Sequence, residues 1–180
     1  MIRFLIVTGL LAGHCAYAHG AGPSKEKYVR VAILKNIDRS SFSVRGKYKI
    51  IDLASGAVLE EGRSPRQFQL SIHPGGIRID GKEHLSRRIR FTASKDITLY
   101  LGDNAQRYRG ALDIIQKSNK KFLVVNTIEL EQYIRGVLYH EVSHRWPMEA
   151  MKAQAVAART YALYQMKKNK NDEYDVTGDI

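Results

Sequence analysis

Residues 122–138 read FLVVNTIELEQYIRGVL, and the periodicity of the chain changes inside this stretch. Residues 122–125 form a continuous apolar run, which is typical of a buried strand. From Glu129 onward the apolar side chains recur at helical spacing, on one face of a helix that Thr127 can cap. We therefore expect the chain to change from strands to helices near Asn126.

Before this boundary, residues 28–125 consist of short runs in which apolar and polar side chains alternate. Gly, Pro, Asn and Asp separate the runs, which is the pattern of antiparallel strands joined by turns. The expected strands cover residues 29–33, 48–52, 57–59, 68–72, 77–81, 89–91, 97–100, 111–115 and 122–125. They predict an antiparallel sheet or a barrel.

After the boundary, residues 126–180 contain a second predicted helix, which begins at Pro147 and runs to about Lys167. Proline favours the first turn of a helix, and Glu149 in that turn suits the helix dipole. Alanines make this helix unusually small-sided, so we expect another element to approach it closely and the helix to be central. The predicted fold class is α+β, with a β-rich antiparallel N-terminal part followed by a two-helix motif.

The first 18 residues have the features of a secretory signal peptide. A positive charge is followed by an apolar run at residues 4–12, and Ala16-Tyr17-Ala18 is a small-x-small cleavage signal. Residues 19–27 would then be a linker. The chain is predicted to be exported, periplasmic or extracellular, with no transmembrane segment after the signal is removed.

A lipoprotein signal is the alternative, because Leu11-Ala12-Gly13 precedes Cys15. His14, however, stands where a small residue is expected. Cleavage after Ala18 would remove the only cysteine, and a thiol-free chain suits an oxidising compartment. A single cysteine also excludes a disulfide-stapled mini-protein and a cysteine-based zinc cluster within this chain.

The chain is strongly basic, with 29 Lys and Arg against 18 Asp and Glu and a formal net charge of +11. For an exported protein this charge favours anionic lipid, cell-wall polymer or acidic glycan as a partner, and we expect no nucleic acid. The densest basic stretch predicts a solvated strand face that is either ordinary surface charge or an anion-binding face. It comprises Lys82, His84, Arg87, Arg88 and Arg90.

The connector between the two predicted helices contains His140-Glu141-Val142-Ser143-His144, which has the H-E-x-x-H pattern. In zinc proteases this pattern places two histidines on one helix face, with the glutamate polarising a metal-bound water. Such a site needs continuous helix, which Pro147 disfavours just downstream. We expect no metal here and keep a zinc protease as a lesser alternative.

The same connector also fits a general acid. A carboxyl group at the edge of an apolar cleft keeps its proton near neutrality and can protonate a glycosidic oxygen. Glu141 is the candidate. Aromatic side chains around it offer flat surfaces for sugar rings or, alternatively, core packing: Tyr133, Tyr139, Trp146 and Tyr161.

Tyr133, Gly136-Val137, Glu141 and Trp146-Pro147 are followed by EAMKAQAVAARTYA at residues 149–162. In this order and spacing, without a gap, they resemble the SpoIID/LytB family, that is, sporulation stage II protein D and the amidase-enhancer proteins. Weaker upstream features are also similar: Val29-Arg30-Val31, Tyr108-Arg109-Gly110 and Val124-Val125-Asn126.

The resemblance implies a lytic transglycosylase of peptidoglycan, a role in cell-wall remodelling and no cofactor. Glu141 aligns with the family's acid, which protonates the oxygen between MurNAc and GlcNAc and then assists formation of a 1,6-anhydro ring. Gln154 and Arg159 would orient the acid or bind substrate, and Tyr133, Trp146 and Tyr161 would contact the glycan. The alternative is a non-catalytic wall-binding protein that stimulates an amidase partner.

The chain departs from the family pattern in three places, one of which is the pair of local histidines, His140 and His144. Val142-Ser143 replaces the family's Met-Pro after the acid. The family also continues well beyond the segment that resembles Tyr174-Asp175-Val176-Thr177, in some members with a Cys/His zinc site. We therefore expect an incomplete SpoIID-like domain, truncated at its C-terminus.

Overall fold

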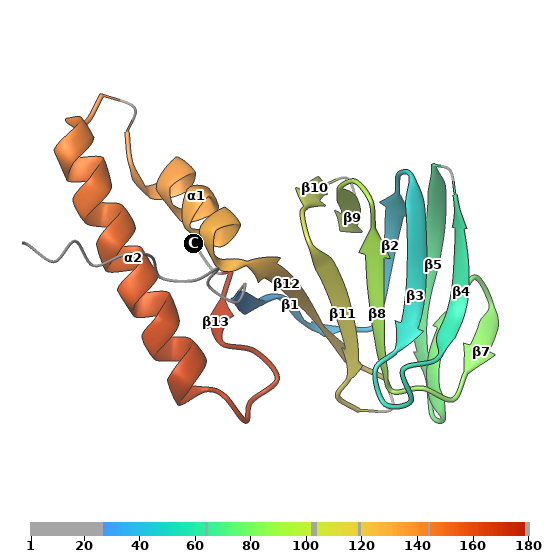
Figure 1. The fold of residues 1–180 in the computed structure, drawn as a ribbon. Helices are drawn as coiled ribbons and strands as arrows, with labels where there is room; N and C mark the ends of the chain where they lie inside the picture. The colour runs from blue at the N-terminus through green and yellow to red at the C-terminus, as the bar shows by residue number, and fades with distance from the viewer. Residues whose placement is uncertain (1–26, 64, 102–103, 119, 144, 179–180) are drawn as a thin grey trace, which may run out of the picture.

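The computed structural model describes residues 27–63, 65–101, 104–118, 120–143 and 145–178. The predicted signal peptide, residues 1–18, lies outside these ranges, as does most of the predicted linker. Within them the chain forms a β-rich body followed by two helices, which confirms the α+β class (Figure 1). Neither helix of the described residues has the length and apolar character that crossing a membrane requires.

The strands form two sheets, which together make a sandwich. The first half of the chain contributes β1 (Tyr28–Ile37), β2 (Arg39–Val44), β3 (Lys47–Asp52), β4 (Val58–Arg63), β5 (Arg66–His73), β6 (Gly76–Ile79) and β7 (Lys82–His84). The second half contributes β8 (Arg88–Ala93), β9 (Ile97–Leu101), β10 (Asn104–Tyr108), β11 (Ala111–Gln116), β12 (Phe122–Glu129) and β13 (Val176–Thr177). One sheet has the order β13-β1-β12-β11-β8-β3-β4 and the other the order β10-β9-β2-β5-β6-β7. Neighbouring strands are antiparallel except for β13, which lies parallel to β1.

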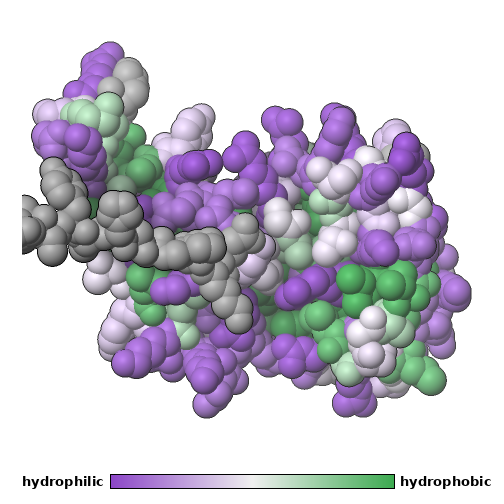
Figure 2. Space-filling view, in the orientation of Figure 1, coloured by the Kyte–Doolittle hydropathy of each residue, from purple (hydrophilic) through white to green (hydrophobic). Residues whose placement is uncertain are grey.

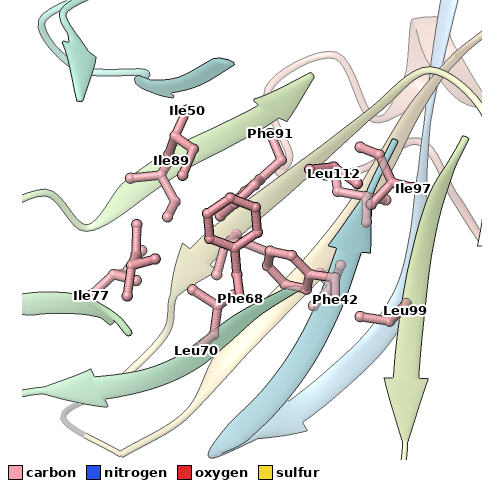
Figure 3. Packing of buried hydrophobic residues seen from close by; sticks show 14 of the residues in the cluster. Phe42, Ile50, Phe68, Leu70, Ile77, Ile89, Phe91, Ile97, Leu99 and Leu112 are labelled. Carbon is pink, nitrogen blue, oxygen red and sulfur yellow. The ribbon is translucent and has the colours of Figure 1, made fainter. Parts of the chain in front are cut away.

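The core of the sandwich lies between the inner faces of the two sheets (Figure 3). Side chains alternate along each strand, so every second residue points inward. Phe91 of β8 contacts Phe42 of β2 edge-on, with ring centroids 4.4 Å apart, and Phe68 of β5 at 5.6 Å. This aromatic group joins the two sheets at the centre of the body.

Strands β1 and β12 extend beyond the sandwich and carry the helical part. Their pairing runs from Ile37 opposite Phe122 to Tyr28 opposite Glu129, with irregularities at the sandwich end. At the far end, Val29 and Val31 join a second, smaller core with residues of both helices and β13. The helices are therefore anchored on an extension of the seven-stranded sheet.

The last strand before the helices ends four residues later than we predicted, whereas the first helix begins within one residue of its expected start. β12 continues to Glu129, and α1 covers Leu130–Glu141. Thr127 is not the cap, because it lies within β12 and its hydroxyl donates to Asp113 Oδ2 at 3.0 Å. Glu129 caps the helix instead, with a side-chain oxygen accepting the N–H of Glu131 at 3.2 Å.

The second helix, α2 (Met148–Lys168), is not central. Ala162 is its buried residue among those described, while Val156, Tyr161 and Tyr164 are exposed. α2 packs against α1, β1 and β13 with one side, and no other helix or strand of the described residues covers its opposite side (Figure 1). Its alanines permit close approach on the packed side, but they do not require a partner on the other.

The predicted basic strand face is also wrong. Lys82 and His84 lie in β7, at the edge of the six-stranded sheet, whereas Arg88 and Arg90 lie in β8 of the seven-stranded sheet. The chain crosses between the sheets within the stretch. Arg90 is moreover neutralised by Asp113, with Nε donating to Oδ1 at 2.6 Å and Nη2 to Oδ2 at 2.7 Å.

Candidate active site

The two helices form a hairpin whose connector begins directly after Glu141. Val142 is extended, with φ −116° and ψ 127°, and its N–H closes the last turn on the carbonyl of Leu138. Trp146 N–H donates to the carbonyl of Ser143, and α2 begins after Pro147. Glu141 is thus the last residue of α1.

An open cavity of about 410 Å³ lies between α1, α2 and β13. α1 contributes side chains at intervals of four, and α2 contributes a stripe at intervals of three and four, so each set lies on one helix face. The lining residues are Tyr133, Val137, Glu141, Gln154, Ala157, Ala158, Tyr161, Val176 and Thr177. The small side chains of α2 leave the room between the helices.

Four of the six predicted site residues line this cavity: Tyr133, Glu141, Gln154 and Tyr161. Gln154 Nε2 donates a hydrogen bond to Glu141 Oε2 at 3.0 Å. This contact agrees with an orienting role for Gln154, which the sequence left open beside substrate binding. Catalytic and binding roles at all four positions stay predictions.

Tyr133 is a partly buried polar residue in the wall of the cavity. Burial raises the pKa of the Tyr133 phenol, and the nearby Tyr161 and Glu141 add to this because a second negative charge is disfavoured. Its hydroxyl therefore stays protonated and able to donate a hydrogen bond at physiological pH. Glu141 itself is exposed, so the described residues do not form the apolar surroundings that we expected for it.

Arg159 and Trp146 do not line the cavity. Arg159 of α2 forms a bidentate ion pair with Glu131 of α1, in which Nε donates to Oε1 at 2.8 Å and Nη2 donates to Oε2 at 2.6 Å. This pairing lowers the pKa of Glu131. Arg159 thus joins the helices, while Trp146 is half exposed in the connector. Substrate contact by either residue stays a prediction.

Five lining residues were not among the predicted site residues: Val137, Ala157 and Ala158 of the two predicted helices, and Val176 and Thr177, whose strand was not predicted. Val176 and Thr177 form β13, which pairs with β1 beside the helices. Asp175 fixes this strand, since its nearly buried carboxylate accepts the backbone N–H of Arg30 at 2.8 Å and contacts the Arg30 guanidinium at 2.5 Å. Only the tertiary fold brings so short a strand to the cavity, because two residues carry no periodic signal.

The described geometry does not fit the zinc-protease alternative. That site needs one helix to carry both histidines of the motif, but α1 ends at Glu141 and Val142 is extended. His144, the second histidine, lies outside the described residues. Within the described ranges, no group of three or more His, Cys, Asp or Glu side chains is arranged to hold a metal ion.

Comparison with known proteins gives a family and one relative. Residues 118–180 match the model of the stage II sporulation protein family, SpoIID. An uncharacterized protein of Brachyspira hyodysenteriae is 32% identical over 148 residues, which cover 82% of this chain and 39% of the relative. The chain therefore spans about two fifths of that relative's length. No solved structure matches the chain.

Proposed function

Since residues 118–180 belong to the SpoIID family, we propose that the chain is a peptidoglycan lytic transglycosylase with Glu141 as its acid. The family match supports a cell-wall-related function. The observation that carries the finer proposal is the hydrogen bond from Gln154 to Glu141 at the cavity between α1 and α2. We further propose that the chain is exported, with residues 1–18 as the signal.

The proposed reaction uses one carboxyl group twice. Glu141 donates its proton to the oxygen between MurNAc and GlcNAc, and the bond from that oxygen to C1 of MurNAc breaks. The C6 hydroxyl oxygen of the same MurNAc then bonds to C1, and the Glu141 carboxylate takes the hydroxyl proton. No water is consumed, and the acid returns to its starting state with a 1,6-anhydro sugar as product.

The hydrogen bonding of Glu141 suits this role. Oε2 accepts the amide N–H of Gln154, and among the described residues no hydrogen bond occupies Oε1. A neutral amide can hold one carboxyl oxygen in place while the other carries the transferred proton. Tyr133 and Tyr161 line the same cavity, with aromatic faces for sugar rings and hydroxyls for hydrogen bonds.

Because Glu141 is exposed, the bound substrate would have to exclude water from its carboxyl group. An acid acts best where water is excluded, because charge interactions are stronger there. The cavity is open, so a bound glycan strand would itself have to cover the carboxyl group. This predicts that short glycan fragments are poor substrates compared with long strands.

The test is mass spectrometry of glycan strands, with and without stem peptides, after incubation with the chain and its Glu141→Gln variant. We expect 1,6-anhydro-MurNAc ends from the parent and a loss of about 10²–10⁴-fold in the variant, the usual contribution of a general acid. Glu149→Gln is the matched control, because it removes an exposed carboxylate of α2 outside the cavity. Reducing-end products would indicate hydrolysis and overturn the mechanism.

The exposed aromatic residues favour a second candidate, a non-catalytic wall-binding protein that stimulates an amidase. Tyr139 of α1 is 83% exposed, and Trp146 of the connector is 48% exposed. Such residues suit a binding surface. In that case Glu141→Gln would leave glycan binding and amidase stimulation intact, and no anhydro products would form from the parent.

A further inference from the structure

A cluster of cations lies at one corner of the seven-stranded sheet, on the face turned away from the sandwich core. Alternation along β3 buries Tyr48 and Ile50 and exposes Lys47 and Lys49. Arg63, at the end of the neighbouring edge strand β4, is exposed as well. The three cations therefore project from the same outer surface.

These side chains border a shallow groove of about 590 Å³, together with Glu61, Thr92 and Ser94. β3 and β4 lie at the end of the β-rich body opposite to α1 and α2, so the groove is separate from the candidate active site (Figure 1). In the view of Figure 2, hydrophilic residues gather over the upper ends of the strands, and a hydrophobic area lies below them.

The charges of this groove are not balanced. Lys49 Nζ pairs with Glu61 Oε2 at 3.0 Å. Lys47 and Arg63, however, lie directly opposite each other across the β3–β4 pair. Among the described residues neither forms an ion pair with a carboxylate. Like charges directly opposite in an antiparallel pair are destabilising, so an anion between them would relieve a repulsion built into the sheet.

We propose that this groove binds an oxyanion of the phosphate type, held between Lys47 and Arg63. The Arg63 guanidinium can fork onto two oxygens, while the Lys47 ammonium supplies a point charge. Ser94 adds a hydroxyl donor, because its Oγ accepts the N–H of Lys47 at 3.0 Å and its proton is left for a ligand. The source is either free phosphate or the phosphodiesters of a polymer.

The first experiment follows the thermal midpoint against phosphate concentration at constant ionic strength. The variants are Lys47→Gln/Arg63→Gln and a control, Lys82→Gln/Arg107→Gln, which removes two exposed cations from the other sheet. A bound ion raises the midpoint with concentration. Phosphate also stabilises proteins by exclusion from their surfaces, so only the difference between variants is informative.

We expect the parent and the control to gain several degrees more than the Lys47→Gln/Arg63→Gln variant. Without phosphate, this variant should be at least as stable as the parent, since the repulsion is gone. That result also shows that the variant folds. The proposal would be overturned if phosphate raised the midpoint of all three proteins equally. It would also be overturned if the control gained as little as the Lys47→Gln/Arg63→Gln variant.

The second experiment distinguishes the sources by equilibrium binding. A glycerol-phosphate polymer that binds at least tenfold more tightly per phosphate than inorganic phosphate would identify a polymer as the ligand. A site for the free ion would give similar values for both. Polyglutamate binding as tightly as the phosphate polymer would contradict the phosphate assignment. Glu141→Gln should leave all these values unchanged, which separates this proposal from the proposed activity.

Discussion

The β-sandwich and the helical part differ in how many of their apolar side chains they bury. The main core of the sandwich contains sixteen described buried residues, whereas the core beneath the helices contains six, one of them an alanine. Because hydrophobic stabilisation grows with the apolar area removed from water, the sandwich supplies most of the stability. The helical part is fastened to it through two long strands, one short strand and polar contacts.

The helical part instead keeps large side chains at the surface. Tyr161, which lines the cavity that holds Glu141, is 57% exposed, and Tyr164, three residues further along α2, is 60% exposed. Exposed apolar groups that cluster in this way commonly mark a binding site. The comparison indicates a stable scaffold that carries a less closed functional unit, and three changes test it.

The largest effect is expected in the sandwich. Phe91→Ala removes a fully buried ring that contacts aromatic residues of the opposite sheet. We expect the free energy of unfolding to fall by about 3–5 kcal/mol, the usual cost of such a cavity. Urea unfolding followed by circular dichroism measures this. Val156→Ala on the exposed side of α2 is the control and should cost less than about 1 kcal/mol.

A loss below about 1 kcal/mol for Phe91→Ala would break the comparison, because it would mean that the sandwich core is not tightly packed.

An intermediate effect is expected where the helical part is fastened. Arg30→Ala leaves the Asp175 carboxylate nearly buried without its guanidinium partner and removes bonds to the carbonyls of Asn169 and Asp172. We expect a loss of about 2–3 kcal/mol, somewhat below the cost of breaking a fully buried ion pair. Hydrogen exchange should accelerate at the N–H groups of Asp175 and Gly178, which bond to β1.

Lys152→Ala, which breaks an exposed pair with Glu149, provides the control and should cost about 0.5 kcal/mol or less. If Arg30→Ala accelerated exchange equally in the sandwich strands, the two parts would unfold as one unit, and the distinction between them would fail.

Periodicity predicted those parts of the fold in which each strand or helix carries its own apolar pattern. It missed β2, where Ser41 and Ser43 occupy outward positions and the buried inward positions hold Ser40 besides the apolar Phe42 and Val44. β2 lies between β5 and β9, so pairing on both sides compensates for its weak pattern. β13 was missed because its two residues carry no pattern of their own. They form a strand only because they pair with β1 and because Asp175 is held by Arg30.

The candidate site was predictable to a similar degree. The spacing of Tyr133 and Glu141 places them on one face of α1, and Gln154 and Tyr161 lie on one face of α2. The sequence could not show that Arg159 faces Glu131 rather than the cavity, because that depends on how the helices are rotated against each other. The exposure of α2 was also hidden, since alanine suits both a buried and an exposed helix.

The smallest effect concerns the ion pair that joins the two helices. The hydrogen bonds from Arg159 lower the pKa of Glu131, so the folded protein holds this carboxylate ionised at a pH at which the unfolded chain begins to protonate. A carboxyl group whose pKa is lower in the folded state stabilises the folded protein at pH values above its pKa in the unfolded chain, which is about 4.3. This stabilisation is lost as the pH falls through the pKa of the folded state. The pair is largely exposed, so its contribution should be about 0.2–1 kcal/mol.

Glu131→Gln should therefore be less stable than the parent at pH 7, with the difference shrinking towards zero below about pH 4. Denaturant titrations of both proteins from pH 3 to pH 7 measure this. A difference that stays constant over this range would mean that Glu131 and Arg159 do not interact as a charge pair. The helices would then be held together by their shared apolar contacts and the hydrogen bond from Gln154 to Glu141, and the charged contacts inferred for the helical part would be limited to Arg30 and Asp175.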